Sequence, residues 1–210
     1  MRVLIIGASS GIGLEATRQA LFAGYQVRAL ARSVGRMTIT DRNLEKFAGD
    51  ALSPKDMRAA LVDVEVAIQT LGVGLADLLG PVQLFSDATK VLIAAMDVQG
   101  VKRLISVTGF GAGDSRAGLG CFQRLPFLMV LGRAYDDKDV QERLIRSSGL
   151  DWTIARPGIL TSGPQTGRYR VLRRPSEWRN GMISRADVAG FLVRQIKDRD
   201  CIRQAPVLVN

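Results

Sequence analysis

The sequence predicts an α/β fold, a doubly wound and mostly parallel sheet with helices on both faces. Three observations carry this prediction. Short apolar runs alternate along the chain with helical patterns, as βαβ units require. The first run, residues 3–6, is continuously apolar, which is typical of a central strand covered on both faces. A glycine-rich turn then joins this run to a helix and a second strand within about 30 residues.

The remaining elements follow in chain order. Helices are expected at residues 14–22, 54–61, 83–97, 133–148 and 184–196. Strands are expected at residues 26–31, 43–48, 65–71, 102–108, 151–156 and 206–209. Pro54 suits the first position of its helix, and Ser184 with Asp187 resembles a capping box in which Asp replaces Glu. Right-handed crossovers should connect the parallel strands.

Two segments interrupt this alternation. Residues 109–132 are glycine-rich and then apolar, and we expect a long loop of the kind that is usually functional. Residues 157–182 hold three prolines, four glycines and an arginine-rich run of Arg168, Arg170, Arg173, Arg174 and Arg179. We interpret this run as a solvated face; the alternative is that it attracts an anionic acceptor. With no linker or repeat, residues 1–210 are expected to form a single domain.

Composition excludes several kinds of chemistry. The 210 residues are 47% apolar and 23% charged, as in ordinary soluble globular proteins. Because the chain has no histidine, Ser-His-Asp and Cys-His machinery are excluded and the commonest metal ligand is missing. Cys121 and Cys201 are too few for a disulfide framework or a cysteine-rich zinc site. We therefore expect no metal site, and chemistry that depends on other groups or a cofactor.

The net charge of +9 indicates an anionic partner. The last 60 residues hold 11 basic and 5 acidic residues, so they carry most of the excess. A phosphorylated cofactor, a nucleic acid and a membrane surface would each fit. A nucleic acid is disfavoured, because the sequence has no recognition-helix or aromatic-platform signature. No apolar run reaches about 18 residues and no signal-peptide pattern follows Met1, so we expect no membrane span and a cytoplasmic protein.

The glycine-rich turn predicts a dinucleotide site. Glycines are needed where the backbone turns tightly and where a pyrophosphate approaches the main chain. The N–H groups at the start of the following helix would hold the anion, and serine hydroxyls could add donors. The predicted cofactor-binding residues here are Gly7, Ser9, Ser10, Gly11, Ile12 and Gly13. The alternative is a tight turn without a ligand.

The end of the second strand favours NADP(H) over NAD(H). NAD sites place Asp or Glu about 20 residues past the glycine-rich turn, on the ribose hydroxyl. Here Arg32 and Ser33 occupy that position, and no carboxylate follows until Asp41. Arg32 can pair with a 2′-phosphate, Ser33 can donate to it, and Arg36 could help. The alternative is a solvated surface arginine.

Other strand ends should complete the site, because open α/β sheets bind ligands at the carboxyl edge of their strands. Asp50 and Ala51 would flank the adenine. Thr70, Leu71 and Gly72 end the fourth strand, and Thr108 ends the fifth. Pro157, Gly158 and Ile159 end the sixth strand and would line the nicotinamide. For each group alone, ordinary turn chemistry is an equal alternative.

These stretches resemble the short-chain dehydrogenase/reductase superfamily, in particular its atypical branch of NAD(P)H-binding proteins. The resemblance covers nearly the whole chain. It is carried by residues 3–13, 49–50, 100–108, 148–158 and 183–189, and by Lys138. Within the branch, the size and layout are similar to biliverdin-IXβ reductase/flavin reductase and bacterial NADH-flavin reductases. The resemblance implies a Rossmann fold, NADP(H), and hydride transfer to a flavin, quinone or similar planar acceptor, with residues 157–210 contributing acceptor-side loops.

The resemblance also implies catalytic residues, with one departure. Family members carry Tyr-x-x-x-Lys, in which Tyr donates a proton and Lys holds the nicotinamide ribose. Lys138 matches that lysine, but Tyr135 is one residue too close and is rotated by roughly 100° relative to the family position. Both side chains still share a helix face. Thr108 is the candidate partner hydroxyl, unless Gly109 holds that position.

Two functions from different classes are therefore consistent with the sequence. The first is an NADPH-dependent oxidoreductase acting on a small-molecule acceptor, because hydride delivery to a flavin needs stacking more than a tuned acid. The second is an NADP-binding redox sensor or scaffold without turnover, which the displaced Tyr135 favours. Candidate walls of the acceptor pocket are Phe110, Phe122, Tyr135 and Trp178, with core packing as the alternative. A monomer and a homodimer both remain open.

Overall fold

The described strands form one large sheet and one small one. The computed structural model describes residues 1–74, 82–118 and 121–210, of which 118 and 121–131 are described as backbone only. Within these ranges, eight strands pair in the order β3-β2-β1-β4-β5-β6-β10-β8. Their bounds are Arg2–Ile6 (β1), Gln26–Ala31 (β2), Leu44–Ala48 (β3), Val66–Gln69 (β4), Arg103–Val107 (β5), Asp151–Pro157 (β6), Arg170–Leu172 (β8) and Val207–Val209 (β10). All neighbours are parallel except β8 and β10. A small parallel sheet pairs β7 (Ile159–Thr161) with β9 (Met182–Ser184).

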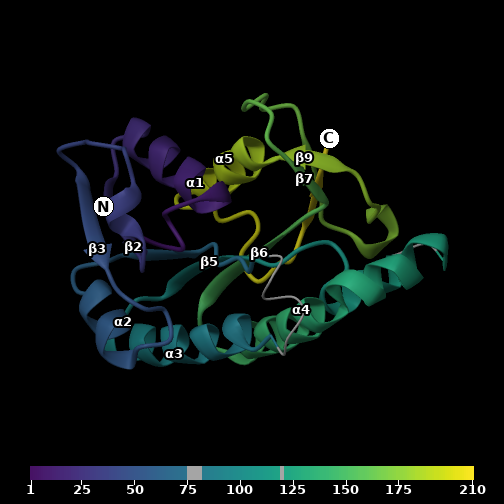
Figure 1. Cartoon of the computed structure of the whole chain (residues 1–210), viewed down its shortest axis with the longest axis horizontal. Coiled ribbons are helices and arrows are strands. Elements are labelled where there is room, and N and C mark those ends of the chain that lie inside the picture. The colour runs from purple at the N-terminus through teal and green to yellow at the C-terminus, as the bar shows by residue number, and fades with distance from the viewer. Residues whose placement is uncertain (75–81, 119–120) are drawn as a thin grey trace.

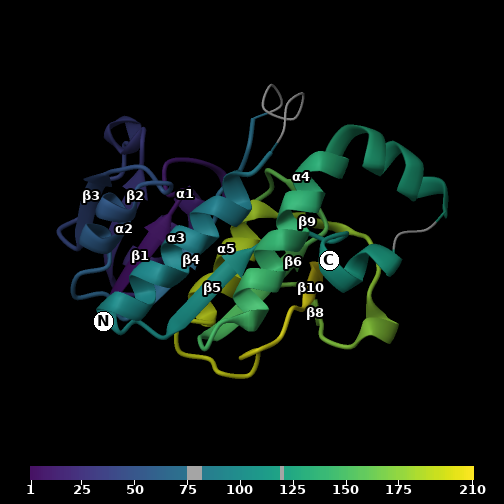
Figure 2. The ribbon, with the colours of Figure 1, turned by 90° about the horizontal axis from the view of Figure 1, so that it is seen from below.

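Helices cover both faces of the large sheet. α1 and α5 pack together on one face, and α2, α3 and α4 lie on the other (Figure 1, Figure 2). Their bounds are Gly11–Phe22 (α1), Pro54–Ala60 (α2), Leu84–Gln99 (α3), Cys121–Ser147 (α4) and Arg185–Arg194 (α5). Short 3-10 helices occur at Val34–Arg36 (η1), Gly113–Gly118 (η3) and Pro175–Glu177 (η4). The predicted doubly wound α/β fold is confirmed.

Strand β1 explains why the first apolar run is unbroken. Val3 and Ile5 pack into the core beneath α1 and α5, whereas Leu4 and Ile6 pack into the core beneath α2, α3 and α4. All four side chains are fully buried. Successive side chains of a strand point to opposite faces, so only a strand covered on both sides needs apolar residues at every position. Each such side chain contributes about 1.5–3 kcal/mol of burial energy.

Helix α4 corrects one prediction. It begins at Cys121, not near residue 133, so the second half of the expected loop at 109–132 is helical; η3 occupies part of the first half. Pro126 and Gly132 disfavour a helix, since an internal proline costs about 3 kcal/mol. Residues 125–131 are also apolar almost throughout, and therefore show no helical alternation of polar and apolar positions.

The start of α5 is fixed from two sides. The Ser184 side chain accepts a hydrogen bond from the Asp187 backbone N–H, as expected for the N-terminal cap. In a capping box, the side chain at position 187 would accept a hydrogen bond from the backbone N–H of the N-cap residue. The Asp187 carboxylate instead accepts hydrogen bonds from the backbone N–H groups of Thr166 and Gly167. The helix start is therefore tied both to β9 and to the loop that follows β7.

Candidate functional site

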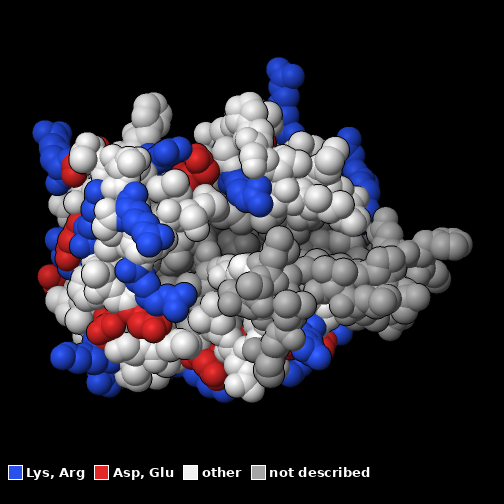
Figure 3. Space-filling model, in the orientation of Figure 1, with Lys and Arg blue, Asp and Glu red and all other residues white. Residues whose placement is uncertain are grey.

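A cleft of about 810 Å³ runs along the carboxyl edge of the large sheet. It is lined by the residues that follow β1, β2, β3 and β4, by the end of β5 and β6, and by the middle of α4. Figure 3 shows the surface hollowed on this face, with basic side chains beside the hollow. This is the edge at which open α/β sheets bind ligands.

The glycine-rich turn is packed too closely to admit side chains at two positions. Gly7 has a φ of +83°, and a Cβ there would lie 2.8 Å from the Thr70 carbonyl oxygen. A Cβ on Gly13 would overlap the carbonyl group of Gly7. Gly13 therefore lies beneath the loop and lets α1 start directly against it, while Gly7 and Gly11 line the cleft. The backbone of the loop is thus exposed to whatever fills the cleft.

The N-terminus of α1 differs from those of its neighbours. Among the described residues, Ser10 makes no capping hydrogen bond with its side chain, and the first turn holds no acid. By contrast, Ser53 caps α2 and Ser184 caps α5. Asp137 of α4 accepts hydrogen bonds from the first N–H groups of α3. The free N–H groups and the dipole of α1 face the cleft and suit an anionic ligand.

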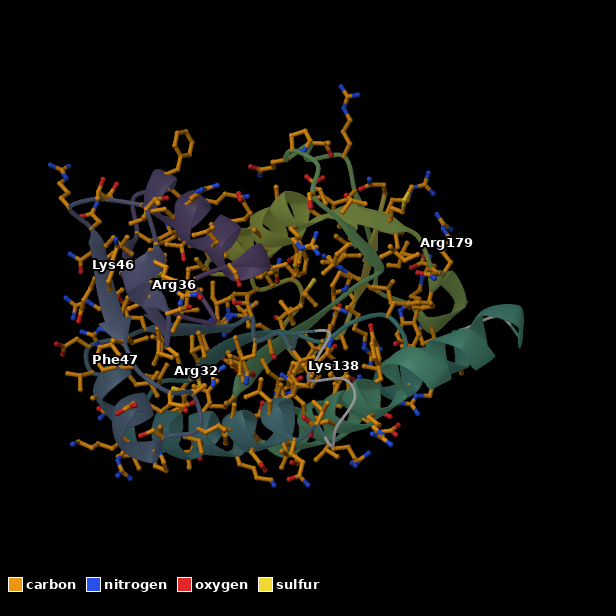
Figure 4. All side chains as sticks on the ribbon, in the orientation of Figure 1. Arg32, Arg36, Lys46, Phe47, Lys138 and Arg179 are labelled. Atoms are coloured by element: carbon orange, nitrogen blue, oxygen red, sulfur yellow. The ribbon has the colours of Figure 1, made fainter. Side chains whose placement is uncertain are left out.

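One end of the cleft carries Arg32 and Ser33, directly after β2. The Ser33 hydroxyl donates to Ser9 at 3.0 Å, which ties the end of β2 to the glycine-rich turn. Arg32 is exposed and makes no ion pair or hydrogen bond within the described part of the chain. Figure 4 shows Arg32 well separated from Lys138 on α4. Arg36, in η1, does not reach the lining that the described residues form.

Lys138 occupies the other end of the cleft. Its ammonium donates to the Thr108 backbone carbonyl at 2.7 Å and lies 5.0 and 4.8 Å from the ring centroids of Phe85 and Tyr135. It makes no ion pair with a carboxylate in the described ranges. Burial therefore lowers the pKa of Lys138 to about 8, although the charge of Glu142 opposes this shift. Lys138 is a desolvated cation that retains donors for a ligand.

Tyr135 lies beside Lys138 despite the shortened spacing. Its hydroxyl fills the space that a side chain at position 109 would occupy, so Gly109 makes room for it. Burial raises the pKa of Tyr135 to about 12. The phenol therefore keeps its proton across the physiological range and is a weaker acid than free tyrosine. Tyr135 and Lys138 both line the cleft, as expected for two side chains on one helix face.

A buried ion pair supports this end of the cleft from below. Glu142 accepts a hydrogen bond from the Thr108 hydroxyl at 2.8 Å and another from Arg156 Nε at 2.9 Å. Both charged side chains are almost fully buried. Arg156 also contacts Asp114, and its guanidinium lies 5.1 Å from the ring centroid of Trp178. The Thr108 hydroxyl thus donates into the protein and not toward a ligand.

The structure brings most of the predicted site residues into one cleft. Those that line it are Gly7, Ser9, Ser10, Gly11, Ile12, Arg32, Ser33, Asp50, Ala51, Thr70, Leu71, Gly72, Thr108, Tyr135, Lys138 and Pro157. Gly13, Gly158 and Ile159 do not belong to this lining. Gly158 packs so closely on the Gly181 carbonyl that a Cβ would overlap it, and Ile159 is exposed in β7 beside Met182.

Only some of the residues expected to form the walls of the acceptor pocket line the cleft. Tyr135 lines the cleft, but Phe110 is buried in a small core with Leu172, and Trp178 packs against that core. The side chain of Phe122 lies outside the described residues. The arginines of the run at 168–179 are exposed, and none contributes to the described lining of the cleft, which fits a solvated face; Figure 4 shows Arg179 far from Arg32.

Sequence reasoning missed several lining residues, chiefly Phe85, Leu160 and Arg185. Leu160 pairs with Ile183 in the small β7–β9 sheet, which no sequence pattern predicted. Arg185 reaches the cleft because this sheet delivers the start of α5 to it. The capping signal at Ser184 was the one sequence feature that placed Arg185 at a helix start.

Comparison with known proteins identifies the family. The profile of the NAD(P)H-binding family matches residues 7–199. The chain belongs to this family. Its fold is similar to that of ChuY, an anaerobillin reductase from Escherichia coli, with 25% identity, a TM-score of 0.82, and coverage of 100% of this chain and 97% of that one.

Two further proteins are similar to the chain, one in fold and one in sequence. A short-chain dehydrogenase/reductase from Veillonella parvula, solved in complex with NADP, shares the fold with a TM-score of 0.83 at 16% identity, covering 100% of this chain and 94% of that one. The photosystem II assembly factor Ycf39 of Cyanophora paradoxa is 28% identical over 155 residues, 73% of this chain. The chain spans 44% of that relative's length.

Two other kinds of feature are absent from the described ranges. No cluster of three or more His, Cys, Asp or Glu residues there could hold a metal ion. No helix in the same ranges combines the length and apolar character that crossing a membrane requires.

Proposed function

We propose that the protein is an NADPH-dependent reductase whose acceptor is a flavin, a quinone or a similar planar molecule. One observation carries this proposal: a single cleft joins the uncapped start of α1 and Arg32 at one end to Lys138 and Tyr135 at the other. A dinucleotide needs an anion site for its pyrophosphate and a polar anchor for each ribose along one continuous groove. The lining residues to which we assign these roles supply an anion site and polar groups along this cleft.

The preference for NADPH over NADH depends on Arg32 and Ser33. An exposed guanidinium without a carboxylate partner among the described residues is suited to bidentate pairing with a 2′-phosphate. A carboxylate at this position would instead select the free 2′-hydroxyl. Asp50 also lines the cleft, but its carboxylate accepts the Leu52 backbone N–H at 3.0 Å and belongs to the turn after β3.

The protein's own residues bind and orient rather than react. When bound, NADPH supplies a hydride, and reduction of the acceptor consumes that hydride and one proton. Lys138 would hold the ribose next to the nicotinamide through its ammonium donors. Thr108, whose carbonyl accepts from Lys138 and whose hydroxyl donates to Glu142, is a positioning residue in this scheme.

A planar acceptor suits this end of the cleft better than an aldehyde or ketone. Reduction of a carbonyl group requires a well-tuned acid near the developing alkoxide, whereas a flavin or quinone takes its proton more readily from water. The raised pKa of Tyr135 makes it a poor acid for the first task. Phe85, Leu160 and Pro157 provide an apolar surface against which a flat ring system can pack.

The experiment is NADPH oxidation by the purified chain with FMN, riboflavin, quinones and simple carbonyl compounds. The proposal expects oxidation with the planar acceptors and little with the carbonyl compounds. Tight NADPH binding without oxidation across the whole panel would support the alternative, an NADP-binding redox sensor or scaffold, which the weak acidity of Tyr135 also favours. Absence of NADPH binding would contradict both.

A further inference from the structure

A second cavity, of about 430 Å³, adjoins the cleft. It lies between α1, the loop after β7 and the start of α5. Gly11 and Arg185 line both the cleft and this cavity, so the two spaces meet at these residues. The cavity meets the cleft between the start of α1 and the residues that follow β6, and Arg32 and Asp50 are not among its described lining residues. It therefore adjoins both the glycine-rich turn and the loop after β7, which belongs to the segment expected to contribute acceptor-side loops.

Arg185 is fixed at this junction by the backbone around it. It is the first residue of α5, directly after the capped Ser184, and Ser184 pairs with Thr161 in the β7–β9 sheet. Asp187 ties the same turn to Thr166 and Gly167 of the loop that forms the far wall. The backbone position of Arg185 is thus set by two strands, a cap and a clamped loop.

The charge of Arg185 has no carboxylate partner among the described residues. Its guanidinium donates a long hydrogen bond, 3.3 Å, to the hydroxyl of Ser162. The side chain is half-buried, so water screens its charge only in part. Glu15 also lines the second cavity, but its carboxylate pairs with Arg18 at 3.0 Å. Arg185 is therefore a positioned, partly desolvated cation at the mouth of a cavity.

We propose that the second cavity receives an anionic side arm of the acceptor, a phosphate or carboxylate, which Arg185 binds while the planar ring lies in the cleft. This inference rests on the proposed function and specifies its acceptor as a planar molecule with a negatively charged arm. A guanidinium binds such groups through paired N–H donors. The pyrophosphate of the cofactor has the same chemistry, and because Gly11 also borders the cavity the test must separate the two.

FMN and riboflavin provide that test, because they share one ring system and differ in the phosphate on the arm. For the wild type we expect kcat/KM to be about 10-fold to 100-fold higher with FMN, the value of one charge-assisted hydrogen-bonded pair. Arg185→Gln should bring the ratio of kcat/KM for FMN to kcat/KM for riboflavin close to 1. It should leave the Kd of NADPH within about twofold of the wild-type value. Arg185→Lys should keep part of the ratio, and Arg179→Gln, exposed and outside both described linings, should keep all of it.

Two results would overturn the inference. A wild-type ratio near 1, or one that Arg185→Gln leaves unchanged, would mean that Arg185 does not bind the arm. Loss of NADPH affinity in Arg185→Gln with an unchanged ratio would assign Arg185 to the cofactor pyrophosphate. If no acceptor is reduced, the proposed function fails separately. Fluorescence titration of FMN and riboflavin into the NADP-loaded protein then decides: preferential FMN binding that Arg185→Gln abolishes upholds the subsite, and equal binding refutes it.

Discussion

The hydroxyl of Tyr135 fills the volume that a side chain at position 109 would need, so the glycine after β5 and the tyrosine of α4 are complementary. The tyrosine–lysine spacing of three residues places Tyr135 and Lys138 on one helix face, and Gly109 accommodates the ring that results. A hydroxyl-bearing side chain at 109 and Tyr135 in its present position exclude each other. Thr108 therefore supplies the hydroxyl near this point, and that hydroxyl donates to Glu142.

This relationship predicts a non-additive pair of substitutions. Gly109→Ala should destabilise the fold by about 1–3 kcal/mol, because the new methyl group overlaps the phenol. Tyr135→Phe removes the overlapping oxygen, so Gly109→Ala should cost clearly less in that background. Urea unfolding of the wild type, both single variants and the double variant measures the coupling. Strict additivity would contradict the proposed overlap.

Arg32 should control the choice of nicotinamide cofactor. Arg32→Ala removes the guanidinium at the end of β2 and should weaken NADPH binding about 10-fold to 100-fold, with NADH affinity nearly unchanged. Arg36→Ala is the matched control, since Arg36 is also exposed and basic but lies outside the described lining of the cleft. Titration calorimetry with both nucleotides measures the effect. Equal losses of affinity for NADPH and NADH would contradict the assignment of Arg32 to the 2′-phosphate.

The glycine-rich turn should tolerate no side chain at Gly13. Gly13→Ala drives a methyl group into the Gly7 carbonyl, so we expect a loss of about 1–3 kcal/mol in unfolding free energy together with weaker NADPH binding. Gly35→Ala is the control, because a Cβ there meets no described atom within 4 Å; its stability should change by about 0.5 kcal/mol or less. Similar stabilities for the two variants would show that the turn can relax.

The sequence predicted the parallel strands of the large sheet because their signals are local, but it did not predict the antiparallel β8. Val3–Ile6 is apolar throughout since both faces of β1 are covered, and Pro54 and Ser184 mark helix starts that the structure retains. The early start of α4 escaped prediction because residues 125–131 show no alternation of polar and apolar positions. Apolar periodicity reports a helix only where one face of it meets water.

The part of the cleft formed by strand ends was predictable up to the end of β6, although Phe85 of α3 was missed, and the part beyond β6 was not predictable. Glycines and polar residues that follow parallel strands must meet at one edge, which located Gly7, Thr70 and Thr108 together, whereas Lys138 was implied by the family resemblance. Leu160 and Arg185 depend on the pairing of β7 with β9, two three-residue strands separated by about 20 residues. Pairing between such short and distant strands leaves no periodic signature in the sequence.

Lys138 should impose a pH dependence on stability. Burial lowers its pKa from 10.5 to about 8 in the folded state, so between these values the unfolded chain binds more protons than the folded one. The free energy of unfolding therefore rises with pH across this window, by at most about 1.4 kcal/mol per pH unit. Lys138→Met should lack this rise, whereas Lys55→Met, at an exposed position, should keep it. Urea unfolding from pH 7 to 10 measures the three slopes, and parallel slopes for wild type and Lys138→Met would contradict the assignment.

Glu142 should be the most sensitive charged position beneath the cleft. Glu142→Gln leaves the fully buried guanidinium of Arg156 without its main counter-charge and should cost about 3–5 kcal/mol. Replacing both residues by Met removes the uncompensated charge, so the double variant should recover most of that loss. Because Glu142 also accepts from Thr108, whose carbonyl binds Lys138, both variants should lower kcat for NADPH oxidation even where stability is regained. Full recovery of kcat in the double variant would show that the ion pair stabilises the fold but does not position Thr108. The sheet alone would then position Thr108.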